Sequence, residues 1–323
     1  MKKFLTVLLV FLLALFTSAC GNDAGDEITL MAPDGAPALA VASIFAEGTV
    51  GGWEVNSSIV AGADEISTNV ANGTADVAIM PVNLAARIYN GGAKIKLVSV
   101  NVTGCLYMVG KNDLASLSDL VGKVVYNIGR GATPDITLKF ILQQSGLEYV
   151  ESDVPVEGKV ALQYVTAASE LVPMLKTGVA EYGIMGEPAV TNCNKVAGTV
   201  TVLDVQAEWE KIVGKGYTQA CLVVSEKIAG KRSFMNALTA RLAASPDWCA
   251  ANAEGLKDIL KSKGSALSVD FTPELVARAN VCYLPASEVR ADVESYLGVL
   301  MGFNPNLVGG KIPDSGFYIR IAE

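Results

Sequence analysis

Histidine is absent from all 323 residues of this chain. Histidine is the commonest transition-metal ligand and the usual general base near neutral pH, so its absence excludes most familiar hydrolytic mechanisms. The sequence also lacks a Gly-x-Ser-x-Gly turn, a Cys-x-x-Cys pair and a phosphate-binding Gly-x-x-x-x-Gly-Lys-Ser/Thr loop. These absences favour a protein that binds a molecule over one that transforms it.

Excess positive charge and long apolar runs are also missing from most of the chain. Lysine and arginine number 25 against 33 aspartates and glutamates, which gives a formal net charge of -8. Nucleic acids require a basic face, so this balance excludes them as partners. Beyond the N-terminal run, no segment approaches the roughly 20 apolar residues that cross a bilayer. The rest of the sequence, about 300 residues, predicts a soluble body large enough for two domains.

The N-terminal segment is typical of a signal peptide. Two lysines precede an apolar run over residues 4–16, and the small residues 17–19 follow it. The Ser-Ala-Cys ending resembles a bacterial lipobox, so we predict that residues 1–19 are removed and that Cys20 carries the lipid, with palmitate among its acyl chains. Residues 20–26 then form a polar tether on the outer face of the bacterial cytoplasmic membrane. An ordinary signal peptide with an incidental cysteine is the alternative.

The cysteine count is odd once Cys20 is set aside. An odd number of thiols cannot all pair within one chain. Each of these residues lies among apolar or small neighbours, which predicts buried free thiols and leaves one disulfide as an open alternative. The five are Cys105, Cys193, Cys221, Cys249 and Cys282.

Strand-like and helix-like segments alternate along the chain, which is typical of an α/β fold. Strands are predicted at residues 28–31, 57–60, 77–80, 95–100, 124–128, 163–165, 182–185 and 200–203. Helices are predicted at residues 36–45, 65–72, 134–145, 169–177, 234–244, 250–263, 273–280 and 286–301.

An internal repeat indicates how these elements are organised. Residues 63–85 align without gaps on residues 168–190. Each copy predicts a helix ended by glycine, an acidic turn, a buried strand and then a loop, at residues 81–83 and 186–188. Chance similarity between apolar α/β segments is the alternative.

A second pair of similar segments predicts two lobes. Residues 103–109 resemble residues 218–224. If one strand leaves the first lobe and the other returns to it, the two form a two-stranded hinge. Lobe one then comprises residues 27–104 and 221–323, and lobe two comprises residues 105–220.

Ligands of α/β sheets bind beyond the carboxyl ends of the strands, and four kinds of loop meet this condition. Glycine and small residues let the backbone approach a ligand in two of them. The repeat-end loops add an amide and a carboxylate, which favours a ligand with an N–H donor, although Glu187 also suits a plain surface position. The candidates in these loops are Asp34, Gly35, Ala36, Pro37, Gly62, Ala63, Pro81, Val82, Asn83, Glu187 and Pro188.

The remaining candidates lie where a predicted strand leads into a helix. Thr133 is predicted as the N-cap, followed by a proline. Unpaired N–H groups at such a terminus attract anionic oxygens, and Arg130 would add a charged donor. Asp135 argues against this, because a carboxylate in the first turn already satisfies the helix dipole. The candidates are Arg130, Gly131, Ala132 and Thr133.

Taken in order, these motifs resemble the solute-binding proteins of the nitrate, sulfonate, taurine and thiamine-pyrimidine transport group. The resemblance spans nearly the whole chain after the predicted signal peptide. It rests on the lipobox and on the segments at residues 32–37, 73–79, 117–123, 131–135, 186–188 and 310–318.

The resemblance implies a type II periplasmic-binding-protein fold that closes by a hinge around one small solute. The expected partners are this solute and the permease and ATPase subunits of an ABC importer. We expect a monomer with no cofactor, no metal and no catalytic residue. The solute itself does not follow from the resemblance, and few aromatic residues near the loops support stacking on a ring.

Two alternatives stay open. A solute-sensing surface lipoprotein would use the same cleft without transport. A pyrimidine synthase of thiamine synthesis shares this fold, but it relies on histidine and a cysteine cluster, which this chain lacks.

Overall fold

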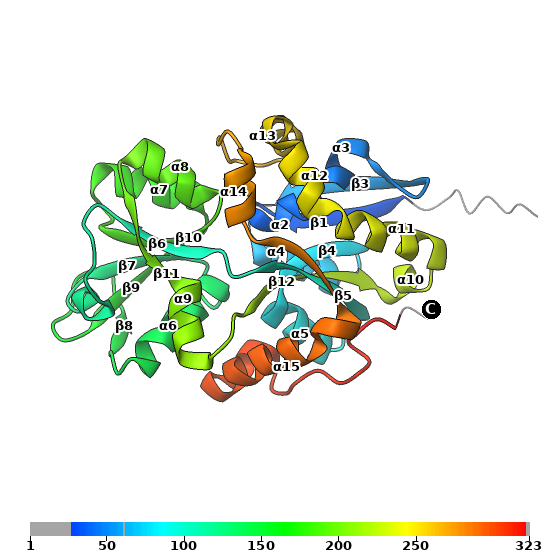
Figure 1. The fold of residues 1–323 in the computed structure, drawn as a ribbon. Coiled ribbons are helices and arrows are strands. Elements are labelled where there is room, and N and C mark those ends of the chain that lie inside the picture. The colour runs from blue at the N-terminus through cyan, green and yellow to red at the C-terminus, as the bar shows by residue number, and fades with distance from the viewer. Residues whose placement is uncertain (1–26, 61, 321–323) are drawn as a thin grey trace, which may run out of the picture.

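The structure is a computed structural model that describes residues 27–60 and 62–320. The predicted signal peptide, Cys20 and the tether lie outside the described residues. Two sheets flanked by helices stand side by side (Figure 1), so the predicted two-lobed α/β fold is confirmed. Within the described ranges, no helix is both long enough and apolar enough to cross a membrane.

The first lobe is built on a sheet of seven strands. These are β1 (Ile28–Pro33), β2 (Thr49–Val50), β3 (Trp53–Val60), β4 (Val77–Pro81), β5 (Ile95–Thr103), β12 (Thr218–Ser225) and β13 (Val281–Pro285). Their order is β13-β5-β12-β4-β1-β3-β2. β1 pairs in parallel with β3 and β4, whereas β12 runs antiparallel to β4 and β5.

The second lobe repeats the same plan with six strands. These are β6 (Leu106–Gly110), β7 (Val124–Ile128), β8 (Tyr149–Glu151), β9 (Val160–Val165), β10 (Tyr182–Gly186) and β11 (Val200–Asp204), in the order β11-β6-β10-β7-β9-β8. The series β6-β10-β7-β9 matches β12-β4-β1-β3 of the first sheet, and β6 is antiparallel to β10. The similarity of residues 103–109 to residues 218–224 therefore falls on equivalent strands of the two sheets.

Helices cover both faces of each sheet, giving three layers per lobe. In the first lobe one face carries α2 (Ala36–Leu39), α3 (Ala42–Glu47), α10 (Glu226–Ala229), α11 (Arg232–Ala243), α12 (Ser245–Ala251), α13 (Ala253–Ser262) and α14 (Pro273–Arg278). The other face carries α4 (Ala63–Ala71), α5 (Val82–Asn90) and α15 (Ala286–Phe303). In the second lobe α7 (Ala168–Thr177) and α8 (Ala189–Ala197) lie opposite α6 (Thr133–Gln144) and α9 (Val205–Val213). Short 3-10 turns lie at Leu117–Leu120 and Pro305–Val308.

The chain passes between the lobes where β5 leads into β6 and again where α9 leads into β12. Only Gly104 and Cys105 separate β5 from β6. A β-carbon at Gly104 would lie 2.9 Å from Cζ of the buried Tyr217, so this crossing requires glycine. On the side away from α14, α15 runs along the first lobe and its far end reaches the second lobe (Figure 1), where Tyr296 contacts Trp209 and Phe303 contacts Phe140. The lobe boundaries given by the sequence stay a proposal.

Several local predictions were wrong. The helix predicted over residues 36–45 is divided into α2 and α3, and the one over 250–263 is broken at Asn252 into α12 and α13. Nearly all of residues 36–45 are buried, so these residues show no amphipathic period that could mark where α2 ends and α3 begins. The position of the break is therefore set by tertiary packing. The loop predicted after β4 is already helical from Val82, because Pro81 both ends the strand and caps α5. Ala132 is the N-cap of α6, and Thr133 is its first helical residue.

All five cysteines of the described region are free thiols, and Cys105 and Cys249 are fully buried. Burial raises the pKa of both thiols from the ordinary 9.0 to about 12. Above pH 9 the unfolded chain therefore loses these protons before the folded protein does, and stability falls as the pH rises toward 12. At about pH 10 each thiol is expected to cost about 1 kcal/mol.

Urea unfolding of the wild type and of Cys249→Ala at neutral and alkaline pH measures this effect. The variant is less stable at neutral pH because it leaves a cavity, but its alkaline loss should be smaller by about 1 kcal/mol. An identical alkaline loss in the two proteins would show that Cys249 ionises as freely in the folded protein as in the unfolded chain.

Candidate ligand-binding site

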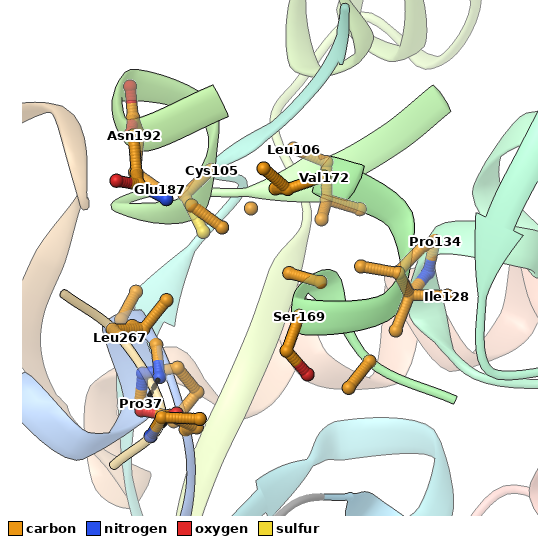
Figure 2. A pocket seen from close by; sticks show the side chains of 18 of the residues that line it. Pro37, Cys105, Leu106, Ile128, Pro134, Ser169, Val172, Glu187, Asn192 and Leu267 are labelled. Carbon is orange, nitrogen blue, oxygen red and sulfur yellow. Dashed lines mark hydrogen bonds between the residues drawn. The ribbon is translucent and has the colours of Figure 1, made fainter. Parts of the chain in front are cut away.

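A cavity of about 430 Å³ lies between the two lobes. The first lobe contributes the turn that opens α2, the residue Gln219 and the segment 266–268 before α14. The second lobe contributes the starts of β6, α6, α7 and α8. Figure 2 shows Leu106 and Val172 on one side of the space, with Pro37 and Leu267 across from them.

Five of the predicted ligand-binding residues line this cavity: Asp34, Gly35, Ala36, Pro37 and Glu187. They come from different lobes, so the structure brings together two loops that lie 150 residues apart in the sequence. The other candidates whose side chains are described are not part of the lining. These are Gly62, Pro81, Val82, Asn83, Arg130, Gly131, Ala132, Thr133 and Pro188. The side chain of Ala63 lies outside the described part of the chain.

Asp34 holds the rim of the cavity together from within the first lobe. Its Oδ1 accepts hydrogen bonds from the Gly35 amide at 3.0 Å and from the Ser265 hydroxyl at 2.6 Å. Its Oδ2 accepts from the Ala266 amide at 2.9 Å. The carboxylate thereby ties the start of α2 to the segment that carries Leu267.

Glu187 connects the two lobes. Its side chain is 0% exposed, and its carboxylate accepts from the amide and the hydroxyl of Thr191, both at 3.0 Å. Arg278 on α14 reaches across from the first lobe and pairs with Oε1 of Glu187 at 2.6 Å. The carbonyl oxygen of Glu187 also accepts from the Ala36 amide at 3.2 Å. The lobes are therefore in direct polar contact at one edge of the cavity.

The predicted anion site at the start of α6 is already occupied by groups of the protein. Asp135 is buried, and its Oδ2 accepts from the Gly131 amide at 2.8 Å and from Lys139 at 3.0 Å. Arg130 pairs with Glu151 and lies over the ring of Tyr164 at 4.9 Å. Asp135 therefore binds groups of its own helix start, as its place in the sequence suggests, and Arg130 is not among the residues that line the cavity.

Several residues that line the cavity were not predicted from the sequence: Cys105, Leu106, Ser169, Val172, Asn192, Gln219 and Leu267. Gln219 holds the crossing strand, since its Oε1 accepts from the Cys105 amide at 3.0 Å. The internal repeat could have indicated the start of α7, because Ala168 aligns with the predicted site residue Ala63. Ala167 precedes Ala168 just as Gly62 precedes Ala63. Nothing in the sequence marks Leu267, which reaches the cavity only through tertiary packing.

Three buried side chains that the sequence or the cavity draws attention to carry unpaired polar atoms. Asn83, Asn127 and Thr133 are buried, and none of their side-chain nitrogen or oxygen atoms has a hydrogen-bond partner within the described residues. Asn127 and Thr133 directly precede the lining residues Ile128 and Pro134. Buried polar groups are rarely left unpaired, so these positions are suited to water or to polar atoms of a ligand. Across the described residues, no group of three or more Cys, Asp and Glu is placed to hold a metal ion.

Two α/β lobes of the same plan, two chain crossings and one cavity between the lobes define the fold of the two-lobed solute-binding proteins. Solved structures of this fold include an ABC transporter from Parabacteroides distasonis, with 24% identity, a TM-score of 0.74 and coverage of 91% of this chain and 99% of that one. The periplasmic aliphatic sulphonate binding protein SsuA from Escherichia coli has 13% identity, a TM-score of 0.65 and 92% coverage of each chain.

The periplasmic nitrate-binding protein NrtA from Synechocystis PCC 6803 also has 13% identity, with a TM-score of 0.62 and coverage of 87% of this chain and 83% of that one. No protein-family model matches the sequence, and none of the curated proteins matches it. At these identities the similarity establishes the fold. The resemblance drawn from the sequence motifs is thus confirmed at the level of the fold.

Proposed function

We propose that this chain is the extracytoplasmic solute-binding component of an ABC importer. The observation that carries the proposal is the cavity between the lobes, whose edge is made by groups of both lobes, Arg278 and Ala36 from one and Glu187 from the other. Such contacts form only when the lobes approach each other. A solute that touches both lobes then stabilises the closed form over the open one.

In this proposal the closed protein docks on the permease and its ATPase, releases the solute and acts as a monomer that is not an enzyme. The names of the fold relatives support the transport role, since they include an ABC transporter and two periplasmic binding proteins. The lipid on Cys20 keeps the protein at the outer face of the membrane. Replacing Cys20 with Ala should release it from the membrane fraction.

The transport role is tested by solute depletion from the growth medium, measured by mass spectrometry. A strain without this chain is complemented with the wild type, with Val172→Arg in the cavity, or with Val179→Arg, a surface residue that is 65% exposed. We expect at least one small solute to remain in the medium of the deletion strain and of the Val172→Arg strain only.

Unchanged depletion in all strains would overturn the importer role. If the deletion then altered transcription in response to a solute, the sensing alternative would replace it. Thermal unfolding of the purified variants verifies that each one is folded.

A further inference from the structure

Within the described residues, no lysine or arginine lines the cavity, and its only charged lining groups are Asp34 and Glu187. Both carboxylates already accept several hydrogen bonds from the protein. Asp34 accepts three hydrogen bonds from its own lobe, and Glu187 accepts two from Thr191 and pairs with Arg278. Most of the acceptor capacity of both groups is thus used within the protein, and the negative charge that Asp34 keeps opposes an anionic solute.

The amide groups at the start of α2, which could otherwise recognise an anion, are engaged within the protein. At the start of α2 the Gly35 amide donates to Asp34, the Ala36 amide donates to the Glu187 carbonyl, and Pro37 has no N–H. At the start of α7, Glu170 places a carboxylate in the first turn and accepts from the Thr166 amide at 3.1 Å. A negative charge there opposes a second anion at the same terminus.

The uncharged residues that line the cavity are mainly apolar. Leu106, Ile128, Val172 and Leu267 supply hydrocarbon surface (Figure 2). The uncharged polar side chains of the lining are Ser169, Ser268, Asn192 and Gln219, and Gln219 is bound to Cys105. The unpaired buried groups next to lining residues, on Asn127 and Thr133, are neutral as well, being an amide and a hydroxyl.

We propose that this cleft takes a neutral, mostly apolar solute with a few hydrogen-bonding atoms and excludes inorganic anions and sulfonates. The inference rests on the proposed role of the cleft as the solute site. The reason is energetic, because an anion buried here would lose its hydration and gain no cationic partner. A neutral solute loses little hydration and gains the burial of its apolar surface.

Two fluorescent probes of one skeleton test the solute class. N-phenylnaphthylamine is neutral, and anilinonaphthalenesulfonate is the same molecule with a sulfonate added. We expect the wild type to bind the neutral probe at least about tenfold more tightly than the sulfonate, as measured by fluorescence titration. Val172→Arg should reverse this preference by placing a cation in the cavity, whereas the exposed control Val179→Arg should keep it.

Three results would each overturn the inference: tighter binding of the sulfonate by the wild type, no binding of the neutral probe, or neutral-probe binding that Val172→Arg leaves unchanged. Preference for the sulfonate would leave the importer role intact. Conversely, if the protein binds the neutral probe in the cleft but its deletion leaves solute depletion unchanged, the solute class would stand and the importer role would be rejected.

Discussion

Replacing Trp209 with Ala is expected to lower the free energy of unfolding by about 3–5 kcal/mol. Trp209 on α9 is 1% exposed, and its ring centroid lies 4.7 Å from that of Phe140, 5.3 Å from that of Tyr217 and 5.6 Å from that of Tyr296. Such a fully enclosed ring leaves a large cavity when truncated. Denaturant unfolding followed by circular dichroism measures the loss.

This cluster also joins the lobes. Phe140 and Trp209 belong to helices of the second lobe, Tyr217 lies just before the strand that returns to the first, and Tyr296 belongs to α15. We therefore expect Trp209→Ala to loosen the contact between α15 and the second lobe in addition to lowering stability.

Trp248→Ala is the matched control, since Trp248 on α12 is only half-buried and packs within the first lobe alone. Trp248→Ala should lower the free energy of unfolding clearly less than Trp209→Ala does, and this control variant should unfold in a single transition. Equal losses for the two variants would contradict a special role for the aromatic cluster.

The general fold is predictable from this sequence because its signals are local. The repeat at residues 63–85 and 168–190 carries its own helix, turn and strand in each copy, and both copies form those elements. The helices α5 and α8 escaped prediction because each follows its strand almost without a turn. The residues that open them therefore look like a loop in the sequence.

The site is predictable only in part, because its geometry depends on contacts between distant segments. The loops at residues 34–37 and at Glu187 follow strands, and this local rule finds them. Arg278 lies 91 residues beyond Glu187, and no local sequence pattern predicts that its guanidinium pairs with the Glu187 carboxylate. Arg130 is a second example, since its neighbours in the sequence suggest an anion site and none of them indicates that its guanidinium pairs with Glu151.

Replacing Arg278 with Gln is expected to weaken binding of N-phenylnaphthylamine about tenfold, which corresponds to about 1.4 kcal/mol. The Glu187 side chain is 0% exposed, whereas that of Arg278 is 48% exposed. Without the guanidinium, the buried carboxylate keeps only its two bonds from Thr191. In the open form water solvates the carboxylate, so the cost falls on the closed form and shifts the equilibrium toward the open one.

Lys195→Gln is the matched control for this prediction. Lys195 on the second lobe pairs with Asp270 on the first at 3.8 Å, but the two side chains are 73% and 69% exposed. An exposed pair of this kind contributes little, so the variant should change the dissociation constant less than about twofold. Small-angle scattering should show a larger radius of gyration for Arg278→Gln only. Equal binding by the two variants would mean that the Arg278–Glu187 pair does not hold the lobes closed, and closure would then depend on the solute and on the other contacts between the lobes.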